Sequence, residues 1–97
     1  MPVFVVHVDR NAGEVASRIG QLPEGDIYRL APNVWMIDYD GTTRALAEKI
    51  GIRGEPAVGS GIAFPISNYS GRAPSDVWEW LRLHLSRLKP RHDGEDL

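Results

Sequence analysis

The sequence predicts an α+β fold (α/β in the broad sense) in which a four-stranded antiparallel sheet is built in the order βαββαβ, with one helix added at the C-terminus. Three observations predict it. A valine-rich run opens the chain, apolar residues then switch between strand and helix spacing, and a long helical stripe closes the pattern. Right-handed crossovers would place the first two helices on one face of the sheet. The other face would then need the third helix or a second copy of the chain to cover it.

Length and composition limit the class of protein. The 97 residues are enough for one domain, which we assign to residues 1–90, and the polar segment 91–97 is expected to be a disordered tail. A net charge of −2 provides no overall positive field for nucleic acid. The absence of cysteine excludes disulfides and cysteine-based zinc sites. No apolar run is long enough to span a membrane and the N-terminus lacks a basic signal region, so we expect a cytoplasmic protein.

The first two elements are a buried strand and a short helix. Val3–Val8 is apolar and β-branched almost throughout, which is typical of a central strand. Asn11 and Glu14 have the spacing of a capping box, in which each side chain would satisfy a backbone N–H of the helix start. Val15 and Ile19 then begin an apolar helical stripe.

A hairpin and a second helix follow. Ile27–Leu30 and Val34–Tyr39 alternate as strands on either side of a short loop. Thr42 or Thr43 is the expected N-cap of the next helix, and Gly51 is the expected residue that ends it.

The last two elements are an edge strand and the longest helix. Ile62–Tyr69 is predicted as the fourth strand, and Pro65 places it at an edge because proline cannot donate to a ladder. Pro74 suits the first turn of the third helix, and Pro90 would end it. The apolar stripe of this helix consists of Val77, Trp78, Leu81, Leu85 and Leu88.

The order βαββαβ is the ferredoxin-like arrangement. A hydrophobic strand ending in Asp9, a capped helix, a hairpin whose second strand begins Asn33-Val34-Trp35-Met36-Ile37, and a closing strand together resemble the CRISPR-associated ferredoxin-like ribonuclease family and the related VapD-type toxins. The resemblance extends over residues 1–70. It implies a homodimer with Asp9 at the dimer interface, where this aspartate would hold a divalent metal.

Spacing alone offers a second argument for a metal site. His7 and Asp9 are two residues apart and would share one face of a strand. If Asp38 or Asp40 lay beside them, the carboxylates could bind Mg²⁺ or Mn²⁺ and activate water for phosphodiester cleavage. The alternative is that Asp9 is a loop or capping residue and that His7 packs in the domain or at an interface.

Three further residues are candidates for binding a nucleic acid or a protein partner. Arg10 and Arg72 lie in predicted loops, where a guanidinium could grip a phosphate or a carboxylate. Arg72 could instead pair with Asp76 or Glu79 on the following helix. Trp80 falls beside the apolar stripe, which favours a role at an interface.

The sequence leaves two functions open, and with them the question of whether the protein is an enzyme. One is a small homodimeric nuclease or toxin-related nucleic-acid-binding protein that uses a divalent metal at Asp9. The other is a non-catalytic protein-binding or regulatory module that uses the surface around Trp80. Fold alone does not decide between them.

Overall fold

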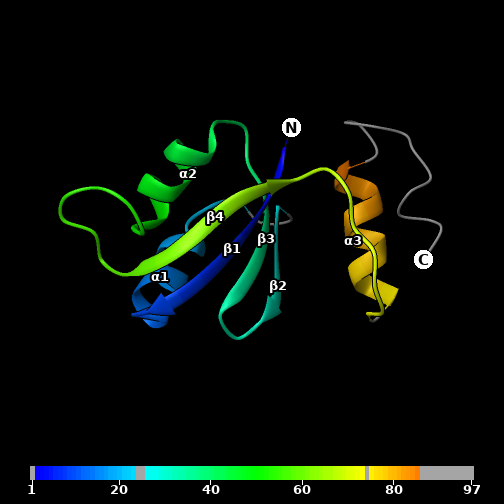
Figure 1. Cartoon of the computed structure of the whole chain (residues 1–97), viewed down its shortest axis with the longest axis horizontal. Coiled ribbons are helices and arrows are strands. Elements are labelled where there is room, and N and C mark those ends of the chain that lie inside the picture. Colours follow the sequence, from blue (N-terminus) through cyan, green and yellow to red (C-terminus); the bar gives the residue numbers. More distant parts are fainter. Residues whose placement is uncertain (1, 24–25, 74, 86–97) are drawn as a thin grey trace.

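The computed structural model describes residues 2–23, 26–73 and 75–85. The predicted order of strands and helices is confirmed (Figure 1). The elements are β1 (Val3–Arg10), α1 (Ala12–Ile19), β2 (Ile27–Ala31), β3 (Val34–Asp38), α2 (Thr43–Ile50), β4 (Ser60–Ile66) and α3 (Ser75–Leu85). The expectations for Pro74, Leu88, Pro90 and the tail 91–97 fall outside the described residues. No described helix has the length and apolar character needed to cross a bilayer.

The four strands form one antiparallel sheet in the order β2-β3-β1-β4, which is the ferredoxin-like fold. β1 lies in the middle of the sheet, as its valine-rich sequence predicts. Val3 on β1 stands opposite both Asp38 on β3 and Ile66 on β4. β4 is an edge strand, as Pro65 predicts.

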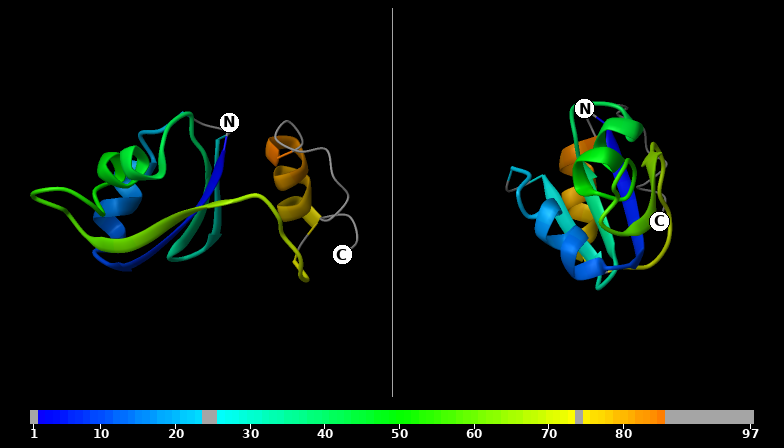
Figure 2. Two further views of the ribbon diagram at one scale, coloured as in Figure 1. Left: turned by 45° about the horizontal axis from the view of Figure 1, so that its top comes forward. Right: turned by 90° about the vertical axis from the view of Figure 1, so that its left-hand side faces the viewer.

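Helices α1 and α2 cover one face of the sheet (Figure 2). Because side chains alternate along a strand, Phe4, Val6 and Val8 point toward these helices and are almost completely buried. The other buried members of this first core are Val15, Ile19, Leu22, Trp35, Ile37, Leu46 and Ile50. Their burial explains why two helices of only eight residues each are stable, since packing supplies what short helices lack by themselves.

Helix α3 lies on the opposite face, at one end of the sheet (Figures 1 and 2). The remaining strand positions Val3 and Met36 are buried there with Val77, Leu81 and Leu85 of α3, forming a second core. Three of the positions predicted for the buried stripe of this helix are therefore confirmed. The helix covers only this end of the sheet, and the rest of the same face carries exposed apolar side chains.

The two helix starts differ in how they are capped. The Thr42 side chain accepts a hydrogen bond from the Ala45 N–H at 3.0 Å, and Gly51 ends α2 with a φ of 90°, both as predicted. The expected capping box at Asn11 is wrong. Asn11 has a left-handed backbone, and its side-chain amide donates to the Val58 carbonyl at 2.8 Å instead of capping α1. This contact ties the start of α1 to the segment before β4.

The fourth strand begins two residues earlier than expected and ends three residues earlier. Its pairing with β1 includes Ser60 and stops at Ile66. Tyr69, expected in the strand, lies after it and stacks on Trp78 of α3, with ring centroids 5.5 Å apart. The segment between β4 and α3 is thereby packed against the helix it leads into.

Candidate functional site: the uncovered face of the sheet

Asp9, the predicted metal ligand, lies at the far end of β1 from α3. The register between β1 and β4 shifts between Val8 and Arg10, so Asp9 is the extra residue of a β-bulge. The Asp9 carboxylate accepts a hydrogen bond from the Ser60 hydroxyl. This contact gives Asp9 a role in joining the bulge to β4, and a metal role for this carboxylate stays a prediction.

The expected cluster of Asp9 with Asp38 or Asp40 does not form. Because β3 runs antiparallel to β1, Asp38 stands opposite Val3. Six residues of extended chain, about 20 Å, separate Val3 from Asp9 along the strand. The carboxylates therefore lie at opposite ends of the sheet, and a metal ion held by both is excluded.

The two arginines predicted to bind a partner are exposed and lie apart. Arg10 ends β1, whereas Arg72 lies in the segment leading to α3 at the other end of the sheet. Within the described part of the chain, Arg72 forms no ion pair with Asp76 or Glu79. Asp76 instead accepts a hydrogen bond from the Tyr28 hydroxyl. Arg10 follows Asp9 in the chain, whereas Arg72 lies at the opposite end of the sheet, so the two arginines do not form one site. Their binding roles stay predictions.

One side of the Trp80 ring packs against other side chains of the same domain. Its ring stacks on His84 with centroids 3.9 Å apart and lies 6.2 Å from the ring of Tyr28. The ring is half-buried and joins the second core. Trp80 therefore helps to dock α3, and its predicted contact with a partner is untested.

A buried aspartate–histidine pair was missed by the sequence reasoning. Asp38 is only 3% exposed, and its Oδ2 lies 2.5 Å from the His84 Nδ1. The Asp26 carboxylate lies close to both, with the three ligand atoms within 4.8 Å of one another. Within the described ranges this is the group of side chains best placed to share a metal ion. The carboxylate–imidazole hydrogen bond fastens α3 to β3 and by itself explains why Asp38 and His84 lie together.

The sequence contained one signal for this pair. Asp38 closes an apolar strand and, by alternation, shares the face of Val34 and Met36 that α3 partly covers. A charged residue on a covered face requires a partner. Identifying His84 as the partner of Asp38 requires knowing which turn of α3 lies over the end of β3.

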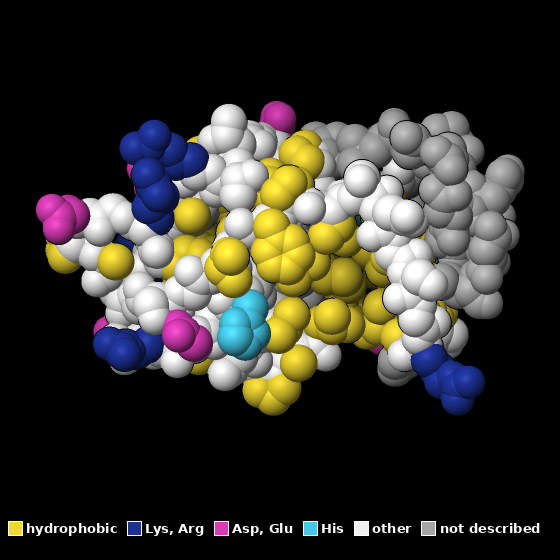
Figure 3. Space-filling model, in the orientation of Figure 1, with side chains coloured by type: hydrophobic (Ala, Val, Ile, Leu, Met, Phe, Trp, Pro, Cys, Tyr) yellow, Lys and Arg dark blue, Asp and Glu magenta, His cyan; other side chains and the backbone are white. Residues whose placement is uncertain are grey.

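The most distinctive surface is the part of the sheet that α3 leaves uncovered. On β4, Ile62 is 58% exposed and Phe64 is 44% exposed. They stand opposite His7 and Val5 of β1, and Val34 of β3 lies opposite His7 on its other side. Figure 3 shows hydrophobic side chains gathered over this region. We call these five residues the open face.

The open face has little charge. Its residues are aliphatic or aromatic apart from His7, and the aspartate on the same side of β3, Asp38, is buried under α3. Large exposed apolar side chains that adjoin one another usually mark an interaction site, whereas single ones are common on any surface. The arrangement is suited to binding another apolar surface.

Comparison with known proteins adds no relative. No family model, no curated protein and no solved structure matches the chain.

Proposed function

We propose that the chain is a non-catalytic protein-binding module whose open face binds a second copy of itself. The observation that supports this proposal is the exposure of Ile62 and Phe64 on β4, on the same face as Val5 of β1 and Val34 of β3. Removing apolar surface from water stabilises an interface by about 25 cal/mol for each Å². A face of this kind therefore favours association.

A second copy fits the face because the face is nearly uncharged. When a surface meets itself across a two-fold axis, a charged group near the axis meets its own copy, and a patch with one sign of charge repels itself. The open face avoids this penalty, since none of its five residues is an aspartate, glutamate, lysine or arginine. A short chain also gains from association, because it buries a smaller share of its own surface than a long chain does.

The surroundings of Asp9 favour binding over catalysis. Divalent-metal hydrolysis generally uses several oxygen ligands around the ion. The carboxylates of Asp38 and Asp40 are held at the other end of the sheet, and Ser60 already hydrogen-bonds Asp9. Of the carboxylates predicted for a metal site at this end of the sheet, Asp9 alone therefore remains to support the nuclease hypothesis.

Sedimentation equilibrium of the parent and of Phe64→Glu tests the proposal across about a hundredfold range of protein concentration. We expect the parent to form a dimer and Phe64→Glu to be monomeric, because the substitution would bury two carboxylates at the interface. Leu83→Glu is the matched control, since this leucine is exposed on α3, outside the open face. It should remain dimeric.

Two results would contradict the proposal. One is a parent that stays monomeric at every concentration. The other is Mn²⁺-dependent cleavage of single-stranded RNA or duplex DNA that is lost in Asp9→Ala, which would establish the nuclease in its place.

A further inference from the structure

The outer edge of β4 has backbone groups that no strand of the described sheet uses. The Val8 N–H donates to the Asn33 carbonyl at 2.9 Å, so the polar groups of Val8 point toward β3. Successive residues of a strand point their backbone groups in opposite directions. His7 and Val5 therefore point theirs toward β4.

The same alternation fixes the direction of the groups on β4. Ile62 and Phe64 stand opposite His7 and Val5 and exchange hydrogen bonds with them. Gly61, Ala63 and Pro65 must then direct their backbone groups away from β1. Pro65 agrees with this assignment, because its missing N–H falls on the outer edge, where no ladder bond is lost. Gly61 and Ala63 each offer one donor and one acceptor there.

This edge lacks the usual protection against pairing. Exposed edge strands are commonly blunted by charged side chains, especially lysine. The seven residues of β4 include no charged side chain, whereas the opposite edge strand, β2, contains Arg29. Pro65 interrupts only the end of β4 near α3, so Ser60 to Phe64 stays open for pairing.

A pocket of about 410 Å³ adjoins this part of the edge. It lies between α2 and β4, and its lining includes Gly61, Ile62 and Ala63 from the strand and Arg44 and Arg53 from the helix side. Both charged side chains of the lining are therefore cationic.

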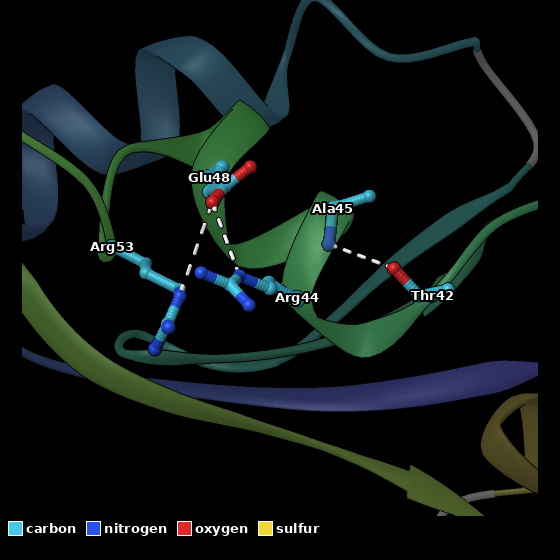
Figure 4. Close-up of polar contacts among 5 residues, drawn as sticks. All are labelled: Thr42, Arg44, Ala45, Glu48 and Arg53. Atoms are coloured by element: carbon cyan, nitrogen blue, oxygen red, sulfur yellow. Dashed lines mark hydrogen bonds and ion pairs between the residues drawn. The ribbon is translucent and has the colours of Figure 1, made fainter.

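The two arginines are available to an incoming anion. Figure 4 shows Arg44 and Arg53 converging on Glu48, with Nε to Oε2 distances of 3.5 and 3.9 Å. The arginine side chains are 71% and 52% exposed. Exposed pairs of this kind contribute at most about 1 kcal/mol, so another carboxylate can take the place of Glu48 at little cost. One glutamate between two arginines also leaves a local excess of positive charge.

We propose that the outer edge of β4 and the adjoining pocket bind an extended acidic segment of another protein. The segment pairs with Gly61 and Ala63 as a fifth strand and places carboxylates against Arg44 and Arg53. The backbone hydrogen bonds provide affinity that does not depend on the side chains of the bound segment. The two arginines then favour segments with acidic side chains. The site uses the outward backbone groups of β4 and shares only Ile62 with the open face, so it goes beyond self-association.

Fluorescence anisotropy with a labelled, acetylated six-residue peptide of alternating valine and glutamate tests the charge preference. We expect this peptide to bind at least about tenfold more tightly than the same peptide with lysine in place of glutamate, and its affinity to fall as salt is added. Equal binding of the two peptides, or no binding of the acidic one, would overturn the proposal.

Two N-methylated forms of the acidic peptide test strand pairing without altering the protein. One form is methylated on the amides that face β4 and the other on the amides that face solvent. A strand added to the edge predicts that one form loses at least about tenfold in affinity while the other binds as the parent peptide does. Equal loss or equal retention would show that the peptide does not bind as a strand.

Charge reversal locates the site on the protein. Arg53→Glu and Arg44→Glu should each weaken binding of the acidic peptide by about tenfold. Lys49→Glu is the matched control, because it makes the same change of charge on α2 outside the pocket lining. An effect of Lys49→Glu as large as that of Arg53→Glu would reduce the interaction to general attraction between charges and refute the assigned site.

Discussion

Gly61 shows how closely the backbones of β1 and β4 approach beside the bulge. A Cβ placed on Gly61 would lie 2.4 Å from the His7 carbonyl oxygen and 3.0 Å from the Val8 Cα. Both are backbone atoms of the central strand, which cannot move aside as the tip of a side chain can. Only glycine fits at this position without displacing the backbone of β1. The side chain of the neighbouring residue, Ser60, hydrogen-bonds Asp9.

Gly61→Ala should lower the free energy of unfolding by about 1–3 kcal/mol, because the methyl group overlaps the backbone of β1. Urea-induced unfolding followed by circular dichroism measures the change. Gly13→Ala is the contrasting variant. Nothing lies within 4 Å of a Cβ at Gly13 in α1, so alanine should raise the free energy of unfolding by about 0.5–1 kcal/mol. Equal effects of the two substitutions would contradict the close approach at Gly61.

At the scale of the element, α3 is attached to the sheet by packing and by two polar contacts. His84 near its end meets Asp38 of β3, and Asp76 in its first turn accepts a hydrogen bond from Tyr28 of β2. The pKa of Tyr28 is raised above its ordinary value, first by the hydrogen bond to Asp76, then by burial, and last by the charge of Asp76. The folded state thus holds the Tyr28 proton more tightly than the unfolded state does.

This difference predicts weaker docking of α3 in alkaline solution. A raised pKa in the folded state means that the contribution of Tyr28 to stability is complete below about pH 10, the pKa of an unfolded tyrosine. The contribution is lost as the pH rises through the higher folded value. Tryptophan fluorescence, which includes Trp78 and Trp80 on α3, should report the change in unfolding experiments. Tyr28→Phe should lack this part of the pH dependence, and an unchanged profile in the variant would exclude the Tyr28–Asp76 contact as its cause.

At the scale of the molecule, one sheet separates two cores of different size. The first core lies under α1 and α2 and includes Leu46, whereas the second lies under α3 and includes Leu81. Among the residues that the structure describes, the first core has ten buried members and the second has five. We therefore expect α3 to open without unfolding the rest of the domain.

Hydrogen exchange on two variants tests the independence of the cores. Leu81→Ala and Leu46→Ala should each cost about 2–5 kcal/mol, since both leucines are buried. Leu81→Ala should speed exchange mainly in α3, because it removes packing from the smaller core. Leu46→Ala should speed exchange throughout β1, α1 and α2. The same distribution of exchange in both variants would show a single cooperative unit.

Sequence patterns predicted the architecture because burial and strand order follow from local properties. The valine run marked β1 as central, Pro65 marked β4 as an edge, and Thr42 marked the start of α2. The expected cluster of Asp9 with Asp38 or Asp40 was wrong, because long-range geometry decides which carboxylates meet. The direction of β3 carries Asp38 away from Asp9 and toward His84. Spacing along one strand contains no information on which turn of a distant helix will meet it.

Two residues in a stretch whose composition favours a loop belong to a strand in the structure. Ser60 and Gly61 belong to a stretch rich in glycine, which favours a loop. In the structure they belong to β4, where Gly61 permits the close approach to β1 and Ser60 holds the bulge at Asp9.

The central position of β1 has a consequence during synthesis on the ribosome. Its two neighbours, β3 and β4, come from residues 34–38 and 60–66. β1 is therefore made before the other three strands but cannot pair on both sides until β4 has been made. Until residue 66 has left the exit tunnel, a valine-rich strand presents an open edge to other nascent chains. Such strands are prone to intermolecular pairing while they wait for distant partners. Translation that slows before residue 60 should therefore lower the yield of folded protein, whereas a pause after β4 has emerged should have little effect.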